Sequence, residues 1–110
     1  MQCQVRSADR THFDGQATMV VARSTRGEFA VMNDHVPLLS AIQSGPLRIK
    51  TADGEFVFAC FEGTLRVAED ATVTVLVEDA FAVNEIGPEI IAAQPEPRRV
   101  VLASVKETYG

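Results

Sequence analysis

Residues 16–47 read Q-A-T-M-V-V-A-R-S-T-R-G-E-F-A-V-M-N-D-H-V-P-L-L-S-A-I-Q-S-G-P-L, and this stretch decides the fold. An apolar strand ends in a charged tip at Arg26-Gly27, and a second short strand follows it. A loop centred on His35 and Pro37 then leads through another apolar run to the turn Ser44-Gly45-Pro46. Short strands separated by tight turns at such brief intervals predict an all-β antiparallel sandwich or barrel.

Apolar and polar side chains alternate along much of the remaining chain. In 47–50, Leu47 and Ile49 would face one way while Arg48 and Lys50 face the other, which indicates a half-buried strand. Residues 56–61 are apolar on both faces, which suits a strand covered on both sides or covered by a partner protein. The Asp-Gly pair in 52–55 predicts a hairpin. We expect strands near residues 2–8, 11–13, 17–24, 27–32, 38–42, 46–52, 55–61, 64–68, 72–77 and 80–84.

The composition changes after Ile86. Gly87-Pro88 fits a helix start, because proline lacks the N–H that the first turn would leave unpaired. Residues 89–94 are expected to form a short helix, and the segment from Arg98 carries apolar side chains at helical spacing. Its valines would equally suit an added strand, but the neighbouring alanine, lysine and glutamate favour helix. We expect a sandwich domain at 1–86 and a short, helical tail at 87–110.

The charge and composition exclude several classes of protein. The 110 residues carry a formal net charge of −5, and the basic pair Arg98-Arg99 is no substitute for the basic patch of a nucleic-acid binder. No apolar run approaches the ~20 residues of a membrane-spanning helix, so we expect no direct membrane insertion. The first residues do not read as a signal peptide, which favours free, buried thiols at Cys3 and Cys60 over a disulfide.

Several reactive groupings were weighed as catalytic or ligand sites. Ser24, Asp34 and His35 can be drawn as a triad, but the strained nucleophile turn that exposes such a serine is missing. The cysteines and histidines lack metal-ligand spacing, and no glycine-rich loop precedes a lysine as in a phosphate-binding loop. We therefore set these catalytic arrangements aside and expect no metal and no cofactor.

An ordered set of motifs over residues 1–86 resembles the amino-terminal domain of the epsilon subunit of F-type ATP synthases. Each motif alone is weak, but their order over some seventy residues is specific. They are Phe13-Asp14-Gly15, Thr25-Arg26-Gly27-Glu28, Asn33-Asp34-His35-Val36-Pro37-Leu38-Leu39, Gly45-Pro46-Leu47-Arg48-Ile49, Glu62-Gly63-Thr64-Leu65-Arg66-Val67 and Val73-Thr74-Val75-Leu76-Val77.

The resemblance implies a flattened β-sandwich of about ten short strands and a role without catalysis. Such a subunit belongs to the central stalk, and it couples rotation of the gamma subunit to the membrane c-ring during ATP synthesis driven by an ion gradient. In a bacterium it would be a peripheral subunit on the cytoplasmic face of the inner membrane. The positions implied for c-ring contact are Glu28, Asp34 and His35, and those for gamma-subunit contact are Phe61, Glu62 and Val77.

The chain departs from the family pattern at informative places. Asn33-Asp34 replaces the usual Pro-Gly before the histidine, and Glu62 replaces the first glycine of a Gly-Gly pair, which adds a carboxylate near the gamma contact. In the tail, Gly87 and Ile90 stand where relatives that bind ATP have aspartate and arginine, which argues against ATP binding there. A final helix of about 17 Å is short for reaching the catalytic head. We expect little or no inhibition of ATPase, and nearly unchanged activity after deletion of residues 88–110.

Two other classes of function remain open from the sequence. The chain could be a free-standing β-sandwich adaptor that binds another protein, in which case it would not co-purify with gamma subunit. It could also be a small ligand-binding module or enzyme, for which a deep pocket lined by Asp34, His35 and another acid would be required.

Overall fold

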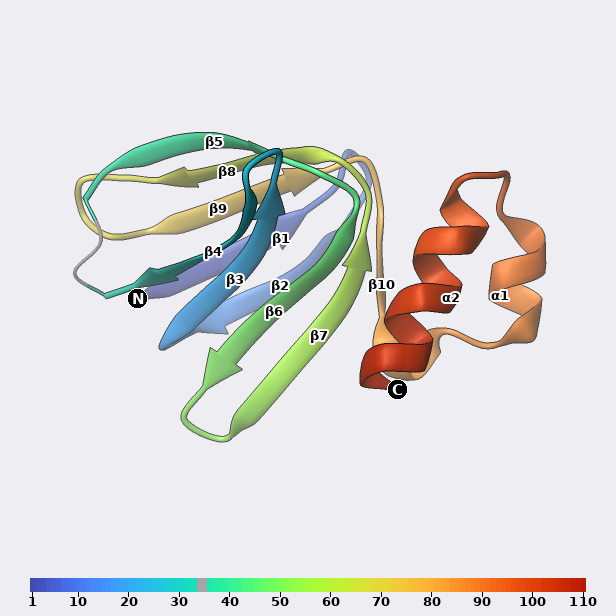
Figure 1. Ribbon diagram of the computed structural model, residues 1–110. Helices are drawn as coiled ribbons and strands as arrows, with labels where there is room; N and C mark the ends of the chain where they lie inside the picture. Colours follow the sequence, from blue (N-terminus) through green and yellow to red (C-terminus); the bar gives the residue numbers. More distant parts are fainter. Residues whose placement is uncertain (34–35) are drawn as a thin grey trace.

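The computed structural model describes residues 1–33 and 36–110, and within them ten strands form two stacked sheets followed by a helical segment (Figure 1). The order is β2-β1-β9-β8-β5 in the first sheet and β10-β7-β6-β3-β4 in the second. All strand pairs are antiparallel except β1 with β9. The strands are β1 (Gln2–Arg6), β2 (Thr11–Gln16), β3 (Met19–Ser24), β4 (Gly27–Met32), β5 (Leu38–Ile42), β6 (Gly45–Thr51), β7 (Gly54–Cys60), β8 (Gly63–Val67), β9 (Val73–Val77) and β10 (Ala80–Ala82). The predicted all-β sandwich is confirmed.

The alternation in the sequence becomes the inner and outer faces of the sheets. On β6, Leu47 and Ile49 are fully buried between the sheets, while Arg48 points outward and pairs with Glu55 of β7 at 3.1 Å. Two-residue periodicity therefore fixes which side chains reach the core. Valines dominate this core from both sheets, among them Val5, Val20, Val31, Val73 and Val75.

The predicted hairpin joins β6 to β7. Thr51 pairs with Gly54, which leaves Ala52 and Asp53 as a two-residue loop. Gly54 has φ of +148°, a region that glycine enters without steric cost. The Thr51 hydroxyl donates to the Gly54 carbonyl at 3.1 Å and accepts from the Asp53 N–H at 3.2 Å. These local bonds set the register of the longest strand pair in the second sheet.

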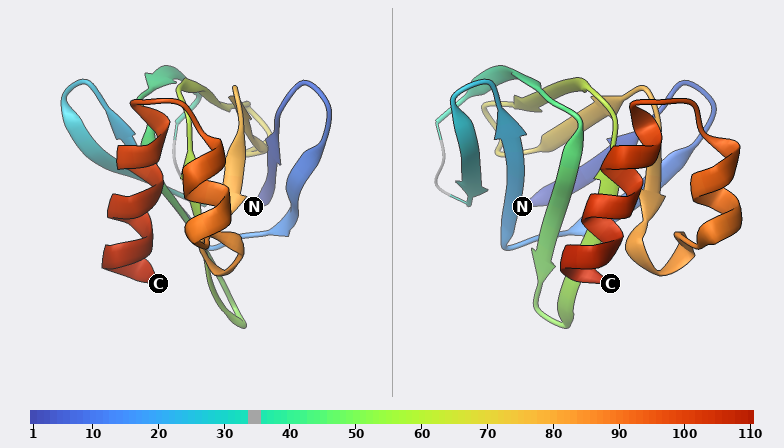
Figure 2. Two further views of the ribbon diagram at one scale, coloured as in Figure 1. Left: turned by 90° about the vertical axis from the view of Figure 1, so that its right-hand side faces the viewer. Right: turned by 45° about the vertical axis from the view of Figure 1, so that its right-hand side comes forward.

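The tail is helical, as preferred over an added strand. A 3-10 turn η1 (Val83–Glu85) leads to α1 (Pro88–Ala93) and α2 (Arg98–Tyr109), and Pro88 occupies the first turn of α1 after the N-cap Gly87. Figure 2 shows α2 lying against β7, with α1 beside it. The helices follow the sandwich in sequence and cover part of the outer face of its second sheet.

The tail explains why β7 is apolar on both faces. Its inward row joins the sandwich core, and its outward row packs under α2 in a second apolar cluster. This cluster joins Ala59 and Phe61 to Ile86, Leu102 and Val105. The sequence left open whether this strand is covered on both sides within the chain or by a partner protein. In the structure, the tail of the same chain covers its outward face.

Both cysteines are buried and unpaired in the described part of the chain. Burial raises the pKa of the Cys3 thiol to about 12 and that of Cys60 to about 11. They behave as small core residues and present no reactive thiolate near neutral pH. Across residues 1–33 and 36–110, none of the helices has the length and apolar character needed to cross a membrane.

Candidate functional site

Of the three residues predicted to contact the c-ring, the structure describes only Glu28. Glu28 is exposed near the start of β4, where it lies opposite Arg23 of β3 in the strand register. Asp34 and His35 lie outside the described residues. The strand runs straight on from Glu28 to Met32, so Asn33 lies about 17 Å from Glu28 at ~3.3 Å per residue. The described part of the loop therefore begins one strand length away from Glu28.

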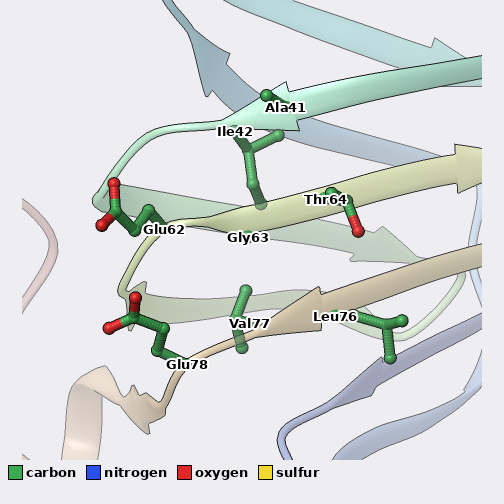
Figure 3. Close-up of a pocket in the computed structure, with 8 residues that line it drawn as sticks. All are labelled: Ala41, Ile42, Glu62, Gly63, Thr64, Leu76, Val77 and Glu78. Carbon is green, nitrogen blue, oxygen red and sulfur yellow. The ribbon is translucent and has the colours of Figure 1, made fainter.

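Two of the predicted gamma-contact residues, Glu62 and Val77, line the same shallow hollow (Figure 3). The hollow has a volume of about 520 Å³ and lies at one end of the first sheet, where β5 and β9 finish and β8 begins. Its floor is apolar and its rim carries two carboxylates. The lining residues are Ala41, Ile42, Glu62, Gly63, Thr64, Leu76, Val77 and Glu78.

Strand pairing builds the hollow around Gly63. This glycine pairs with Ile42 of β5 on one side and with Val77 of β9 on the other. A Cβ on Gly63 would overlap the carbonyl oxygen of Leu76, so only glycine allows the two strands to approach so closely. Leu76 remains 52% exposed beside it, which leaves an apolar surface at the strand ends.

Backbone hydrogen bonds hold the two carboxylate-bearing residues side by side. The Glu78 N–H donates to the Glu62 carbonyl at 3.2 Å, and the Glu62 N–H donates to the Ser44 hydroxyl at 3.1 Å. Both residues are exposed. In Figure 3 their side chains lie at the same end of the strands. The rim therefore presents negative charge above an apolar floor.

Phe61 precedes Glu62 in sequence but belongs to the other side of the molecule. It is 2% exposed, buried beneath the tail helices, and its ring packs edge-on against Phe81 with centroids 6.3 Å apart. The guanidinium of Arg98 lies over the same ring, 4.4 Å from its centroid. As the chain is folded here, Phe61 offers no free surface to a partner, and Val77 is 7% exposed.

Arg98 connects the tail to the rim of the hollow. Its guanidinium donates to the Glu78 carboxylate at 3.1 Å while it stacks on Phe61. In the sequence, Arg98 stood out as the start of the tail helix and as part of a basic pair, and Glu78 did not stand out. The sequence does show an acid, Glu78, directly after the Val73–Val77 strand. Its partner Arg98 is 20 residues away, and the two meet only because the tail helix docks on the sandwich.

Ser24 does not act as the nucleophile of the triad considered with Asp34 and His35, because its hydroxyl is engaged in a turn. Its hydroxyl donates to the Gly27 carbonyl at 3.1 Å and accepts from the Arg26 N–H at 3.2 Å, so it closes the β3–β4 turn. The two other members, Asp34 and His35, lie outside the described residues. Among the residues that are described, no group of three potential metal ligands comes together.

A different serine and histidine meet where the β1–β2 turn joins β2. The Ser7 hydroxyl lies 2.8 Å from His12 Nε2 and 3.1 Å from an Asp9 carboxylate oxygen to which it donates. Partial burial lowers the pKa of His12, and the nearby Arg10 charge lowers it further. Since the hydroxyl is already shared within the turn, this pair pins the loop between two strands.

Comparison with known families identifies the sandwich. Residues 1–83 match the family described as "ATP synthase, Delta/Epsilon chain, beta-sandwich domain". A protein of Streptomyces avermitilis named ATP synthase epsilon chain is 44% identical over 80 residues, which are 73% of this chain and 64% of that protein. An ATP synthase epsilon chain of Xanthomonas campestris is 30% identical over 108 residues, which are 98% of this chain and 77% of that protein. The alignment thus spans less than two thirds of the length of the Streptomyces relative.

Solved structures share the fold at low sequence identity. A chain in the structure of the Euglena gracilis mitochondrial ATP synthase, an OSCP/F1/c-ring assembly, superposes with a TM-score of 0.74 at 16% identity, covering 96% of this chain and 76% of that one. A chain in the central stalk/c-ring structure of the Tetrahymena thermophila mitochondrial ATP synthase gives 0.62 at 19% identity, covering 97% and 88%. These likenesses extend over the tail as well as the sandwich.

Proposed function

The chain belongs to the ATP synthase delta/epsilon family, and on that premise we propose that it is a non-catalytic subunit of the central stalk of a rotary F-type ATP synthase. In this role it fastens the gamma subunit to the c-ring, so that rotation driven by an ion gradient reaches the catalytic head. It works as a peripheral subunit of the membrane-bound complex, on the cytoplasmic face of the inner membrane in a bacterium.

The match of residues 1–83 to the family carries this proposal. Relatives that align over almost the whole chain carry the name ATP synthase epsilon chain, which supports the same role. The adaptor and the small enzyme are the competing functions. The hollow is shallow, and the described residues that line it include two acids and Thr64 but no histidine, which favours a binding surface over an active site.

The proposed gamma contact uses the hollow at the strand ends. Glu62 is exposed there, and Val77 contributes to the apolar floor. Phe61 would take part only if the tail helices moved aside, because Leu102 and Val105 pack in the same cluster. The proposed c-ring contact uses Glu28 on the β4 edge together with Asp34 and His35.

We further propose that the tail neither binds ATP nor inhibits hydrolysis appreciably. Uncharged Gly87 and Ile90 support the first point. The second rests on length, since the 12 residues of α2 span only about 18 Å at 1.5 Å per residue. Deleting residues 88–110 would uncover Ala59 and Phe61. The deletion test of ATPase therefore needs a parallel measurement of unfolding, so that lost stability is not taken for lost regulation.

Co-purification with the gamma subunit encoded by the same organism tests the proposal. We expect tagged full-length chain to bring down gamma in a stoichiometric complex. Glu28→Ala is then expected to lower coupled ATP synthesis in reconstituted vesicles while the complex with gamma still forms. Retention of the chain without any gamma would favour the adaptor instead.

A further inference from the structure

We propose that α2 is a strap across β7, fastened at each end by an arginine that lies against an aromatic ring and pairs with a glutamate. At the first residue of the helix, Arg98 lies over Phe61, and at its last residue, Tyr109 receives Arg48 of β6. We call these two contacts the latches. Their release frees the whole helix while the sandwich stays folded. This inference concerns the chain by itself and does not depend on the proposed function.

The latch at the start of the helix joins Arg98 to two parts of the sandwich. Its guanidinium lies 4.4 Å from the centroid of the Phe61 ring and donates to the Glu78 carboxylate at 3.1 Å. A planar guanidinium can stack on a ring and pair with a carboxylate at the same time. Phe61 directly follows β7 and Glu78 directly follows β9, so this helical residue is tied to strand ends of both sheets.

The latch at the end of the helix uses the same chemistry with the partners exchanged. Here the arginine belongs to the sheet and the ring to the helix, since Arg48 lies 5.4 Å from the centroid of the Tyr109 ring. Arg48 donates to the Glu55 carboxylate of β7 through Nε at 3.3 Å and through Nη2 at 3.1 Å. Because a bidentate pair fixes the orientation of a guanidinium, Glu55 holds Arg48 in place for the ring.

Between the latches, α2 is attached over a small area. Leu102 and Val105 are the buried residues of the helix, and they pack in the cluster with Phe61. Lys106 adds a hydrogen bond to the Val83 carbonyl at 3.2 Å. A helix of 12 residues is marginal in water without packing partners. Local opening of α2 is therefore easier than unfolding of the two sheets, and the latches set how often it occurs.

Both latches are largely sheltered from water. The side chain of Arg48 is 25% exposed and that of Arg98 is 29% exposed. A fully exposed ion pair contributes little, because water and salt screen it, but the contact of a cation with a ring strengthens as water is excluded. Each latch is therefore expected to shift the opening equilibrium of α2 by a measurable factor.

Amide hydrogen exchange of the full-length chain, resolved by residue with NMR, tests the strap. We expect Arg98→Gln and Arg48→Gln each to speed exchange of the amides along α2 about 3- to 10-fold, because each variant removes one latch. The amides of β1 and β9 should change by less than about twofold. With both substitutions together, the two factors should multiply, since the helix opens as a unit.

Arg99→Gln is the matched control. Arg99 is the next residue of the same helix, but its side chain donates to the Gln94 carbonyl at 2.6 Å, within the tail. This variant removes the same charge without touching a latch and should alter α2 exchange by less than about twofold. An acceleration equal to that in Arg98→Gln would assign the effect to net charge, and the inference would be wrong.

The distribution of the acceleration along the chain decides the rest. If each latch variant speeded only the amides at its own end of α2, the helix would fray and not open as a strap, which overturns the inference. Equal acceleration in α2, β1 and β9 would mean that the arginines support the whole fold and not the attachment of the tail, which overturns it as well. Unchanged exchange in both variants would show that the apolar cluster alone holds the helix.

Salt gives an independent readout without any substitution. Raising the salt concentration from about 50 to about 500 mM screens both arginine–glutamate pairs. We expect α2 exchange in the parent chain to speed about two- to threefold and that of the double variant to stay nearly constant. The same salt response in both chains would contradict the role of the latches.

Discussion

Gly63 allows the backbones of β8 and β9 to approach closely at the end of the first sheet. Any side chain there would meet the Leu76 carbonyl oxygen, which is part of the neighbouring backbone and cannot swing away. We expect Gly63→Ala to lower the free energy of unfolding by about 1–3 kcal/mol, the usual cost of overpacking. Urea titration followed by circular dichroism measures it.

Gly15→Ala is the control for that substitution. A Cβ at Gly15 would meet only the Phe13 ring at 3.5 Å, an ordinary contact distance. Its unfolding midpoint should stay close to that of the parent chain. An equal loss in both variants would show that backbone freedom, and not the close approach at Gly63, sets the cost.

His12 makes stability depend on pH. Its pKa is lowered in the folded state, mainly by burial. Below the ordinary value of about 6.5 the unfolded chain therefore binds the proton more readily than the folded chain, and acidification through that range favours unfolding. We expect the urea midpoint to fall between pH 7.5 and 5.5 by more in the parent chain than in His12→Gln. Equal falls would assign the pH dependence to other groups.

At this scale the sequence indicated some site residues and missed others. Glu62 and Val77 were indicated by family position, and the strand register brings both to one hollow. Glu78 and Arg98 were missed because their pairing joins residues 20 apart through the docking of a helix, which no local pattern encodes. Phe61 was indicated as a contact, but burial under the tail depends on the same docking.

At the scale of elements, the docking of α2 on β7 is the interaction most open to test. Leu102 is fully buried in the cluster with Phe61 and Ala59, whereas Val100 on the same helix is 63% exposed. We expect Leu102→Ala to destabilise the chain by about 2–5 kcal/mol, the range for emptying a buried leucine site. Differential unfolding in urea, with limited proteolysis of the tail, provides the readout.

Val100→Ala is the matched variant on that helix. It removes apolar volume from an exposed position and should alter stability by no more than about 0.5 kcal/mol. If both variants behaved alike, α2 would not be packed on the sheet as described. Rapid proteolysis of the tail in the parent chain would contradict the docking directly.

The elements themselves could be predicted well from local patterns. Alternation, Asp-Gly at 53–54 and Gly-Pro at 87–88 located the strands, a hairpin and a helix start to within a few residues. The segment from Arg98 was predicted to be helical, with an added strand as the alternative because its valines suit a sheet. Packing of Leu102 and Val105 against the outward row of β7 settles that choice, and such long-range packing is not written in helix propensity.

For the whole molecule, the sandwich and tail form a continuous body with contacts at its surface. The apolar cluster under α2 is buried, whereas the hollow at the strand ends is open to solvent. Glu28 lies on β4, an edge strand of the second sheet. These features suit the proposed role of a part that joins two neighbours. The proposed partners follow only from the family resemblance, since no charge pattern or spacing within one chain identifies the surface that it meets.

The most direct test of the coupling role compares ATP synthesis with ATP hydrolysis in vesicles that carry the ATP synthase of the same organism. After removal of this chain, we expect synthesis driven by an ion gradient to be lost while the catalytic head still hydrolyses ATP. Adding back the purified chain should restore synthesis. Undiminished synthesis in vesicles lacking the chain would contradict the account.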